Sequence, residues 1–105
     1  MSKNKDIHEL TNLLAVALRH RIGAIVNSNE LYAQKYAKDA DILMKEAQKA
    51  AARKNWNSHD KREIREELRI KLMAELTSRD FLDARKFDIM DKEMDRALRE
   101  MGLDG

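Results

Sequence analysis

The chain has no proline and no cysteine, and two of its three glycines lie within the last four of its 105 residues. Proline costs about 3 kcal/mol and glycine about 1 kcal/mol inside a helix, so almost nothing interrupts helical structure. Without cysteine there is no disulfide framework, no thiolate metal ligand and no thiol nucleophile. The longest apolar run, residues 13–18, is far shorter than the roughly 20 residues of a membrane span. These absences predict an all-α, cytoplasmic protein without a membrane segment.

Neither sign of charge predominates, because the formal net charge is only +2 although 38% of the residues are charged. Hydrophobic residues make up 43% of the chain, which is enough for a core and excludes a disordered composition. The balance does not resemble that of a strongly basic nucleic-acid-binding protein. The length fits one helical domain over residues 1–105, of a size that often completes its core against a second copy.

Polar clusters divide the chain into helical segments. Asp6 followed by Glu9 has capping-box spacing and predicts the start of the first helix, which ends at residues 27–29. A second helix is expected over about 30–55, a third from its expected N-cap Ser58, and a fourth from about 77–78 to a C-terminal cap at Gly102. Since the breaks at 27–29 and 77–78 lack proline and glycine, three longer helices are the alternative. The expectation is a bundle of three to four helices, completed by dimerisation.

The first helix carries two apolar stripes, where a monomeric bundle needs one broad face per helix. The first stripe contains Ile7, Leu10, Leu14, Ala17, Leu18, Ile22 and Ile25. The second contains Leu13, Val16, Ala17 and Ala24, with His20 beside it. We therefore expect this helix to be central, and we predict a homo-oligomer interface at Leu13, Val16, Ala17 and His20.

The other segments each show one apolar stripe at helical spacing. The second helix is expected to bury Tyr32, Tyr36, Ala40, Leu43, Ala47 and Ala50. The third is expected to bury Ile64, Leu68, Leu72 and Leu76, supplemented by Ile70 and Met73. The fourth has Phe87, Met90, Met94, Ala97 and Met101.

Basic residues gather in the middle of the chain, where residues 45–71 hold nine lysines or arginines against five acidic residues, a net charge of +4. We call one set of these positions the basic ridge: Lys45, Lys49, Arg53, Lys54, Trp56, Lys61 and Arg62. Its cations suit phosphates and its tryptophan suits stacking. The alternative is a solvated face with ion pairs such as Glu67 with Lys71. The sequence thus predicts a self-associating binding or adaptor module, with nucleic acid or a protein as possible partner.

One local pattern suggests catalysis instead. Five residues separate Arg53 from His59, and both residues lie at a junction between predicted helices. This spacing resembles the arginine-to-histidine motif of the HEPN ribonucleases, an all-α family. The resemblance implies a metal-independent ribonuclease in which His59 is the general acid or base and Arg53 stabilises phosphate charge across a dimer.

Carboxylate pairs raise the question of a metal site. Glu63 with Glu66 and Asp88 with Asp91 have helical spacing, but Arg62 and Lys92 are close enough to neutralise them as surface ion pairs. We therefore predict no metal and no cofactor.

Overall fold

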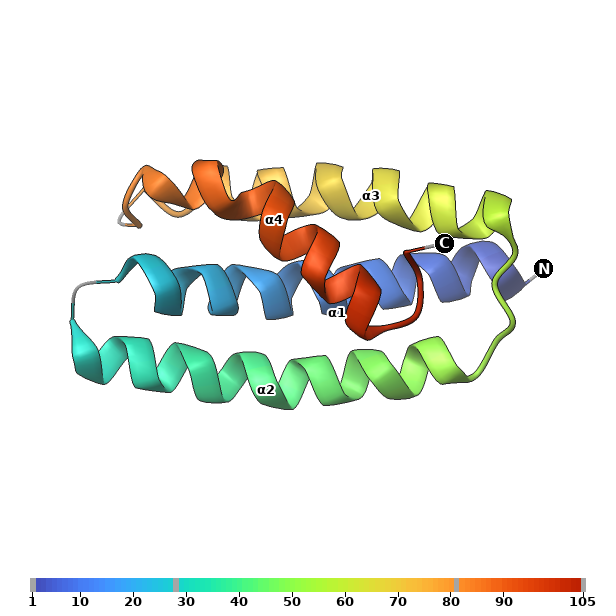
Figure 1. Cartoon of the computed structure of the whole chain (residues 1–105), viewed down its shortest axis with the longest axis horizontal. Coiled ribbons are helices and arrows are strands. Elements are labelled where there is room, and N and C mark those ends of the chain that lie inside the picture. Colours follow the sequence, from blue (N-terminus) through green and yellow to red (C-terminus); the bar gives the residue numbers. More distant parts are fainter. Residues whose placement is uncertain (1, 28, 81, 105) are drawn as a thin grey trace.

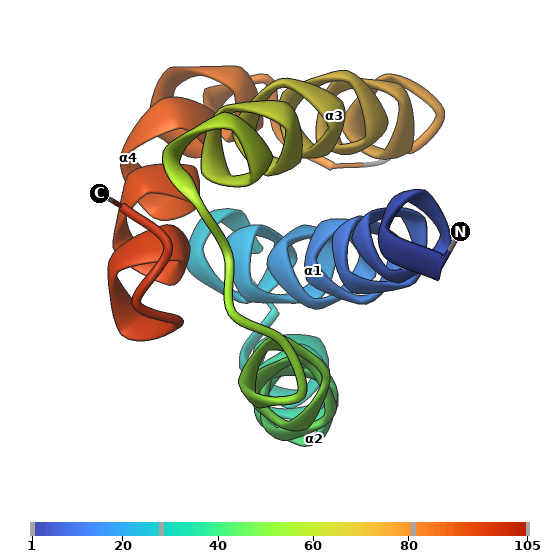
Figure 2. The ribbon, with the colours of Figure 1, turned by 90° about the vertical axis from the view of Figure 1, so that its right-hand side faces the viewer.

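The computed structural model describes residues 2–27, 29–80 and 82–104, and over these residues the chain forms four helices and no strand. They are α1 (Ser2–Val26), α2 (Glu30–Ala52), α3 (Ser58–Thr77) and α4 (Arg85–Glu100). Helices α2, α1 and α3 lie side by side with α1 in the middle, and α4 crosses one face of this layer obliquely (Figure 1). The end-on view in Figure 2 shows the same layer with α4 to one side of it. The all-α bundle is confirmed, with four helices rather than three.

Helix α1 is the central helix, as predicted, because α2, α3 and α4 all pack against it. Its first stripe forms much of the core, with Leu10, Leu14, Leu18 and Ile22 fully buried. Ile25 departs from this pattern, since 51% of its surface is exposed near the end of the helix. The three neighbours cover α1 on several sides, and they leave Leu13, Val16 and Ala24 of the second stripe only partly buried.

The predicted start of the first helix is wrong by one turn. Helix α1 begins at Ser2, and Asp6 lies inside it rather than at its N-cap. No residue in this segment breaks a helix, so the helix continues past the capping-box spacing toward the N-terminus. Asp6 and Glu9 instead form ion pairs with basic residues after α2.

Helix α2 begins as expected. Asn29 is its N-cap, and the side-chain oxygen of Asn29 accepts hydrogen bonds from the backbone N–H groups of Leu31 and Tyr32. Tyr32 is not buried as predicted, because it is 58% exposed in the first turn of the helix. Tyr36, one turn later, is the tyrosine that meets α1, where its ring lies against Gly23. The absence of a side chain at Gly23 leaves room for this ring, since a Cβ there would be 3.1 Å from Tyr36 Cδ2.

Helix α3 is capped by Asn57 and not by Ser58. The side-chain oxygen of Asn57 accepts a hydrogen bond from the Asp60 backbone N–H at 2.8 Å, and the Asp60 carboxylate accepts one from the Asn57 N–H at 3.0 Å. This reciprocal capping box satisfies two backbone donors, which is why the helix starts one residue after Asn57. Ser58 becomes the first residue of the helix.

The apolar stripe of α3 is confirmed at Ile64, Leu68, Leu72 and Leu76, all fully buried. The two supplementary positions are wrong, because Ile70 is 71% exposed and Met73 is 39% exposed. Each residue turns the helix by about 100°, so Ile70, two residues from both Leu68 and Leu72, points to the far side of the helix. Met73, one residue after Leu72, points to its flank.

The predicted start of the fourth helix is also wrong. Thr77 and Ser78 end α3, with Ser78 as the C-cap, and α4 begins only at Arg85. Met90, Met94 and Ala97 are buried as expected, whereas 41% of Phe87 is exposed in the first turn of α4. Gly102 follows the end of α4 with a φ of +71°, the left-handed conformation that glycine adopts readily after a helix.

Within the described ranges, none of the four helices has an apolar stretch long enough to cross a membrane.

Candidate binding surface

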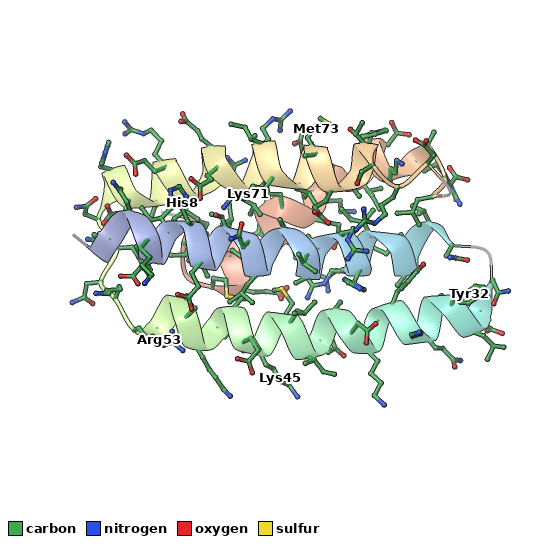
Figure 3. All side chains as sticks on the ribbon, turned by 180° about the vertical axis from the view of Figure 1, so that it is seen from behind. His8, Tyr32, Lys45, Arg53, Lys71 and Met73 are labelled. Carbon is green, nitrogen blue, oxygen red and sulfur yellow. The ribbon has the colours of Figure 1, made fainter. Side chains whose placement is uncertain are left out.

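The basic ridge is divided in the structure. Lys45 and Lys49 lie on exposed positions of α2, Lys61 and Arg62 lie in the first turns of α3, and Arg53 and Lys54 follow the end of α2. Figure 3 shows Lys45 pointing away from the rest of the molecule, whereas Arg53 lies at the end of α2. The seven residues therefore do not form one continuous cationic surface.

The central members of the ridge are neutralised by α1. Arg53 Nη1 lies 3.5 Å from Glu9 Oε1, and Lys54 Nζ lies 3.2 Å from Asp6 Oδ2. Both acids come from the first turns of α1, so these two pairs fasten the end of α2 to the central helix. A phosphate would have to compete with these carboxylates for both cations.

The Trp56 side chain makes its contacts within the molecule. Its indole Nε1 donates a hydrogen bond to the Ala51 backbone oxygen at 2.8 Å, and the half-buried ring packs against the core. Lys3 Nζ lies 5.9 Å from the ring centroid, within cation–π distance. In this arrangement the ring closes the end of α2 and is not presented as a stacking platform.

Lys3 also reaches α3, where its ammonium lies 2.5 Å from the buried Asp60 carboxylate. Hydrogen bonds from Lys3 and from the Asn57 backbone hold the pKa of Asp60 below its usual range. The cap of α3 is thus joined electrostatically to the start of α1.

Arg53 and His59 each pair with a different carboxylate. His59 Nε2 lies 2.9 Å from Glu63 Oε1, one turn along α3, while Arg53 pairs with Glu9. Over the described residues no hydrogen bond joins Arg53 to His59. The structure does not bring the two residues of the ribonuclease-like motif together within one chain.

Three of the four predicted interface residues lie against the molecule's own helices, whereas Val16 is only partly buried and lines an open pocket between α1 and α3. Ala17 is fully buried, and Leu13 packs against the core while partly exposed. His20 lies edge-on to the Tyr36 ring with centroids 5.9 Å apart, and its Nδ1 lies 2.8 Å from the Val16 backbone oxygen. Helix α2 therefore covers much of the face for which a second copy was predicted.

A polar cluster between α1 and α3 was not predicted as a unit. The Thr11 hydroxyl donates to Glu67 Oε2 at 2.5 Å, and Lys71 Nζ donates to both Thr11 Oγ1 and Glu67 Oε2 at 2.7 and 3.0 Å. The Glu67–Lys71 ion pair itself was predicted and is confirmed. The third member of the cluster, Thr11, gave only one signal in the sequence, namely a threonine within the apolar pattern of the first helix. In Figure 3, His8 and Lys71 lie close to one another where these two helices meet.

Glu67 is the common acceptor of this cluster. Burial alone would raise the pKa of its carboxyl, but hydrogen bonds from Thr11, His8 and Lys71 outweigh burial and hold that pKa below its usual range. Because Lys71 is paired and Thr11 has no exposed surface, the cluster joins two helices and offers no accessible nucleophile. Among the described residues there is no group of three or more histidine or acidic side chains that could hold a metal ion.

Helix α2 has a second face, directly opposite α1, that none of the other described helices covers. We call it the outer stripe; its members are all exposed and follow one another at steps of four and three residues: Leu31, Lys35, Lys38, Ile42, Lys45, Lys49 and Ala52. Lys49 lies 3.8 Å from Glu46, and the other three lysines have no ion pair over the described residues. None of the Cα atoms of α2 lies within 8 Å of a Cα atom of α3 or α4 in the described helices. The outer stripe therefore presents a row of four exposed lysines that the other described helices leave open.

Comparisons of the chain with protein-family models, with curated proteins and with solved structures found no match in any of the three.

Proposed function

We propose that the protein is a small helical binding or adaptor module that holds an acidic partner on the outer stripe of α2. The observation that carries the proposal is the placement of Lys35, Lys38, Lys45 and Lys49 on one exposed side of a helix, away from α1. Exposed ammonium groups are strongly hydrated and bind weakly one at a time, but a row of them can bind a complementary row of acids.

This surface differs from the one that the sequence pattern favoured. Arg53 and Lys54 serve the fold through α1, and Trp56 is held by Ala51. Lys45 and Lys49 remain available from the original ridge, and Lys35 and Lys38 extend them toward the start of α2.

A nucleic-acid backbone is one acidic partner of this kind. Lys61 and Arg62 lie on α3, on the other side of α1 from the outer stripe, so the lysines of the stripe itself would have to supply the phosphate contacts. Such binding should weaken steeply as salt rises, because each neutralised phosphate releases counterions.

Self-association also stays a prediction. It was inferred from the two apolar stripes of α1, and the packing of α2, α3 and α4 around this helix gives those stripes partners within the chain. Light scattering at micromolar concentration tests it directly. A ribonuclease active across such a dimer would further require His59, so cleavage of RNA that is lost in His59→Ala is the corresponding assay.

The test of the proposed surface is a charge reversal with a matched control. Lys38→Glu with Lys45→Glu changes the net charge by four units on the outer stripe, and Lys92→Glu with Arg99→Glu makes the same change on the exposed side of α4. Binding to fluorescent polyglutamate and to a short DNA duplex is measured by anisotropy at low and moderate salt. We expect the first variant to bind the acidic probe at least about tenfold more weakly, which corresponds to about 1.4 kcal/mol, and the second to bind it almost normally.

Two results would contradict the proposal. One is a wild-type protein that binds neither probe at low salt. The other is an equal loss in both variants, which would mean that net charge rather than the outer stripe governs binding.

A further inference from the structure

The outer stripe is not purely basic, and its apolar members have a regular place in it. Leu31 is 77% exposed and Ile42 is 54% exposed, and they lie eleven residues apart with two lysines between them. Two more lysines follow Ile42 before the stripe ends at Ala52. A surface that only attracted phosphates would gain nothing from two large apolar side chains among its lysines.

The spacing also has the period of a helix–helix contact. Steps of four and three residues give an average of 3.5, so over three heptads the stripe stays on one side of α2 for roughly 32 Å. A second helix crossing at about 20° can follow such a stripe over most of its length. Binding of a phosphate backbone would not require side chains at this period.

The charge of the outer stripe then indicates what kind of partner helix it would bind. The stripe itself contains four lysines and no acid, whereas Asp41 and Glu46 lie beside it on α2. Over its whole length α2 carries four basic and four acidic residues, so its long-range attraction for a polyanion is weak. The attraction is local and patterned. Two copies of the stripe would also place lysines against lysines, which disfavours a second copy of this chain as the occupant.

We propose that the outer stripe binds an acidic amphipathic helix of another protein, laid along α2. Apolar side chains of that helix would pack on Leu31 and Ile42, and its glutamates or aspartates would pair with the lysines between and beyond them. This inference rests on the proposed function, because it names the chemistry of the acidic partner at the same surface.

The experiment uses the full chain and three synthetic helical peptides of about 22 residues. One repeats leucine at heptad spacing with glutamates on either side, the second replaces each glutamate with lysine, and the third scrambles the first so that composition is kept and the period is lost. Titration calorimetry or anisotropy gives the dissociation constants. We expect the acidic amphipathic peptide to bind at least about tenfold more tightly than the other two.

Two isoleucines provide a matched pair of variants. Ile42→Ser removes the apolar centre of the outer stripe, and Ile70→Ser makes the same change at a position on α3 that is 71% exposed. Both side chains lie on the surface, so both variants should fold, which circular dichroism checks. Ile42→Ser should weaken binding of the acidic peptide about tenfold, and Ile70→Ser should leave it unchanged. The double variant Lys38→Glu with Lys45→Glu should no longer bind the acidic peptide and should instead bind the lysine peptide.

The possible failures are distinct. Binding of the scrambled acidic peptide as tight as that of the amphipathic one, or binding unaffected by Ile42→Ser, would overturn the acidic helix and leave the proposed function standing. Tight binding of duplex DNA with no binding of the amphipathic peptide would do the same and indicate nucleic acid. Binding of no acidic probe at all would overturn both proposals.

Discussion

Lys45 and Arg53 are eight residues apart in the same basic segment, yet their surroundings are opposite. Eight residues of an α-helix give a rotation of about 80° beyond two full turns, which is enough to move a side chain from the outer side of α2 toward its flank. Arg53 therefore reaches Glu9 of α1, while Lys45 stays in solvent. Both residues are basic, and their spacing in the sequence predicted that both lie on the surface. It could not predict which cation meets an acid on another helix, because that depends on how α1 and α2 are aligned.

Thr11 and Glu67 show the same limit for the polar cluster. They are 56 residues apart and become neighbours only when α1 packs against α3. The i,i+4 pair of Glu67 with Lys71 is local and could be predicted, whereas the threonine hydroxyl that completes it could not.

Glu67 gives the molecule a specific acid sensitivity. A carboxyl whose pKa is lowered by folding contributes stability that is present above its unfolded pKa, about 4.3, and is lost as the pH falls through the lower folded value. Glu67→Gln should therefore lower the free energy of unfolding by about 1 kcal/mol at pH 7. The difference from wild type should shrink between pH 5 and pH 3. Urea denaturation across this range measures it.

The matched control is Glu66→Gln, which removes the neighbouring exposed carboxylate. It should change stability little at any pH. A difference between wild type and Glu67→Gln that stayed constant down to pH 3 would show that the carboxylate's charge is not what stabilises the contact between α1 and α3.

At the scale of the helices, periodicity predicted faces better than it predicted ends. The stripe Ile64, Leu68, Leu72 and Leu76 was predicted completely, because four leucine-like residues at steps of four define one side of a helix. The starts at Asp6 and near residues 77–78 were wrong, since a capping-box spacing also occurs inside a helix and small polar residues also follow one. An end is decided by which backbone N–H groups find a partner, and several nearby residues could have supplied one.

The start of α3 tests this directly, because Asn57 and Ser58 are adjacent and both are common N-cap residues. Asn57→Ala should lower the free energy of unfolding by about 1 kcal/mol, since the Asp60 N–H loses its acceptor and the capping box is lost. Ser58→Ala should change it by less than about 0.5 kcal/mol. Chemical denaturation of the two variants compares them, and a larger loss in Ser58→Ala would mean that the cap has been assigned to the wrong residue.

For the molecule as a whole, the position of α1 at the centre accounts for its first apolar stripe and for part of its second. The sequence alone allowed two explanations, a second copy or more neighbours in the same chain. Composition could not decide between them, because the apolar area to be covered is the same in both cases. The outer stripe was missed for a related reason: two of its lysines, Lys45 and Lys49, were assigned to a ridge that continued into the next connection, and the alignment of Arg53 and Lys54 with α1 divides that ridge.

The central place of α1 also predicts an order of opening. Helix α2 packs on α1 alone among the described helices, and four of its five buried residues are alanines: Ala40, Ala47, Ala50 and Ala51, beside Met44. Small side chains bury little apolar area, so separating α2 from α1 should cost less free energy than separating α3, whose buried residues include three leucines and an isoleucine. In hydrogen exchange followed by mass spectrometry, amides from the middle of α2 should exchange faster than those of α1 and α3. Equal protection of α2 and α3 would show that the molecule opens only as one unit. If the outer stripe binds an acidic helix, the same measurement with the amphipathic peptide added should slow exchange chiefly in α2, because the bound helix would give this helix its second neighbour.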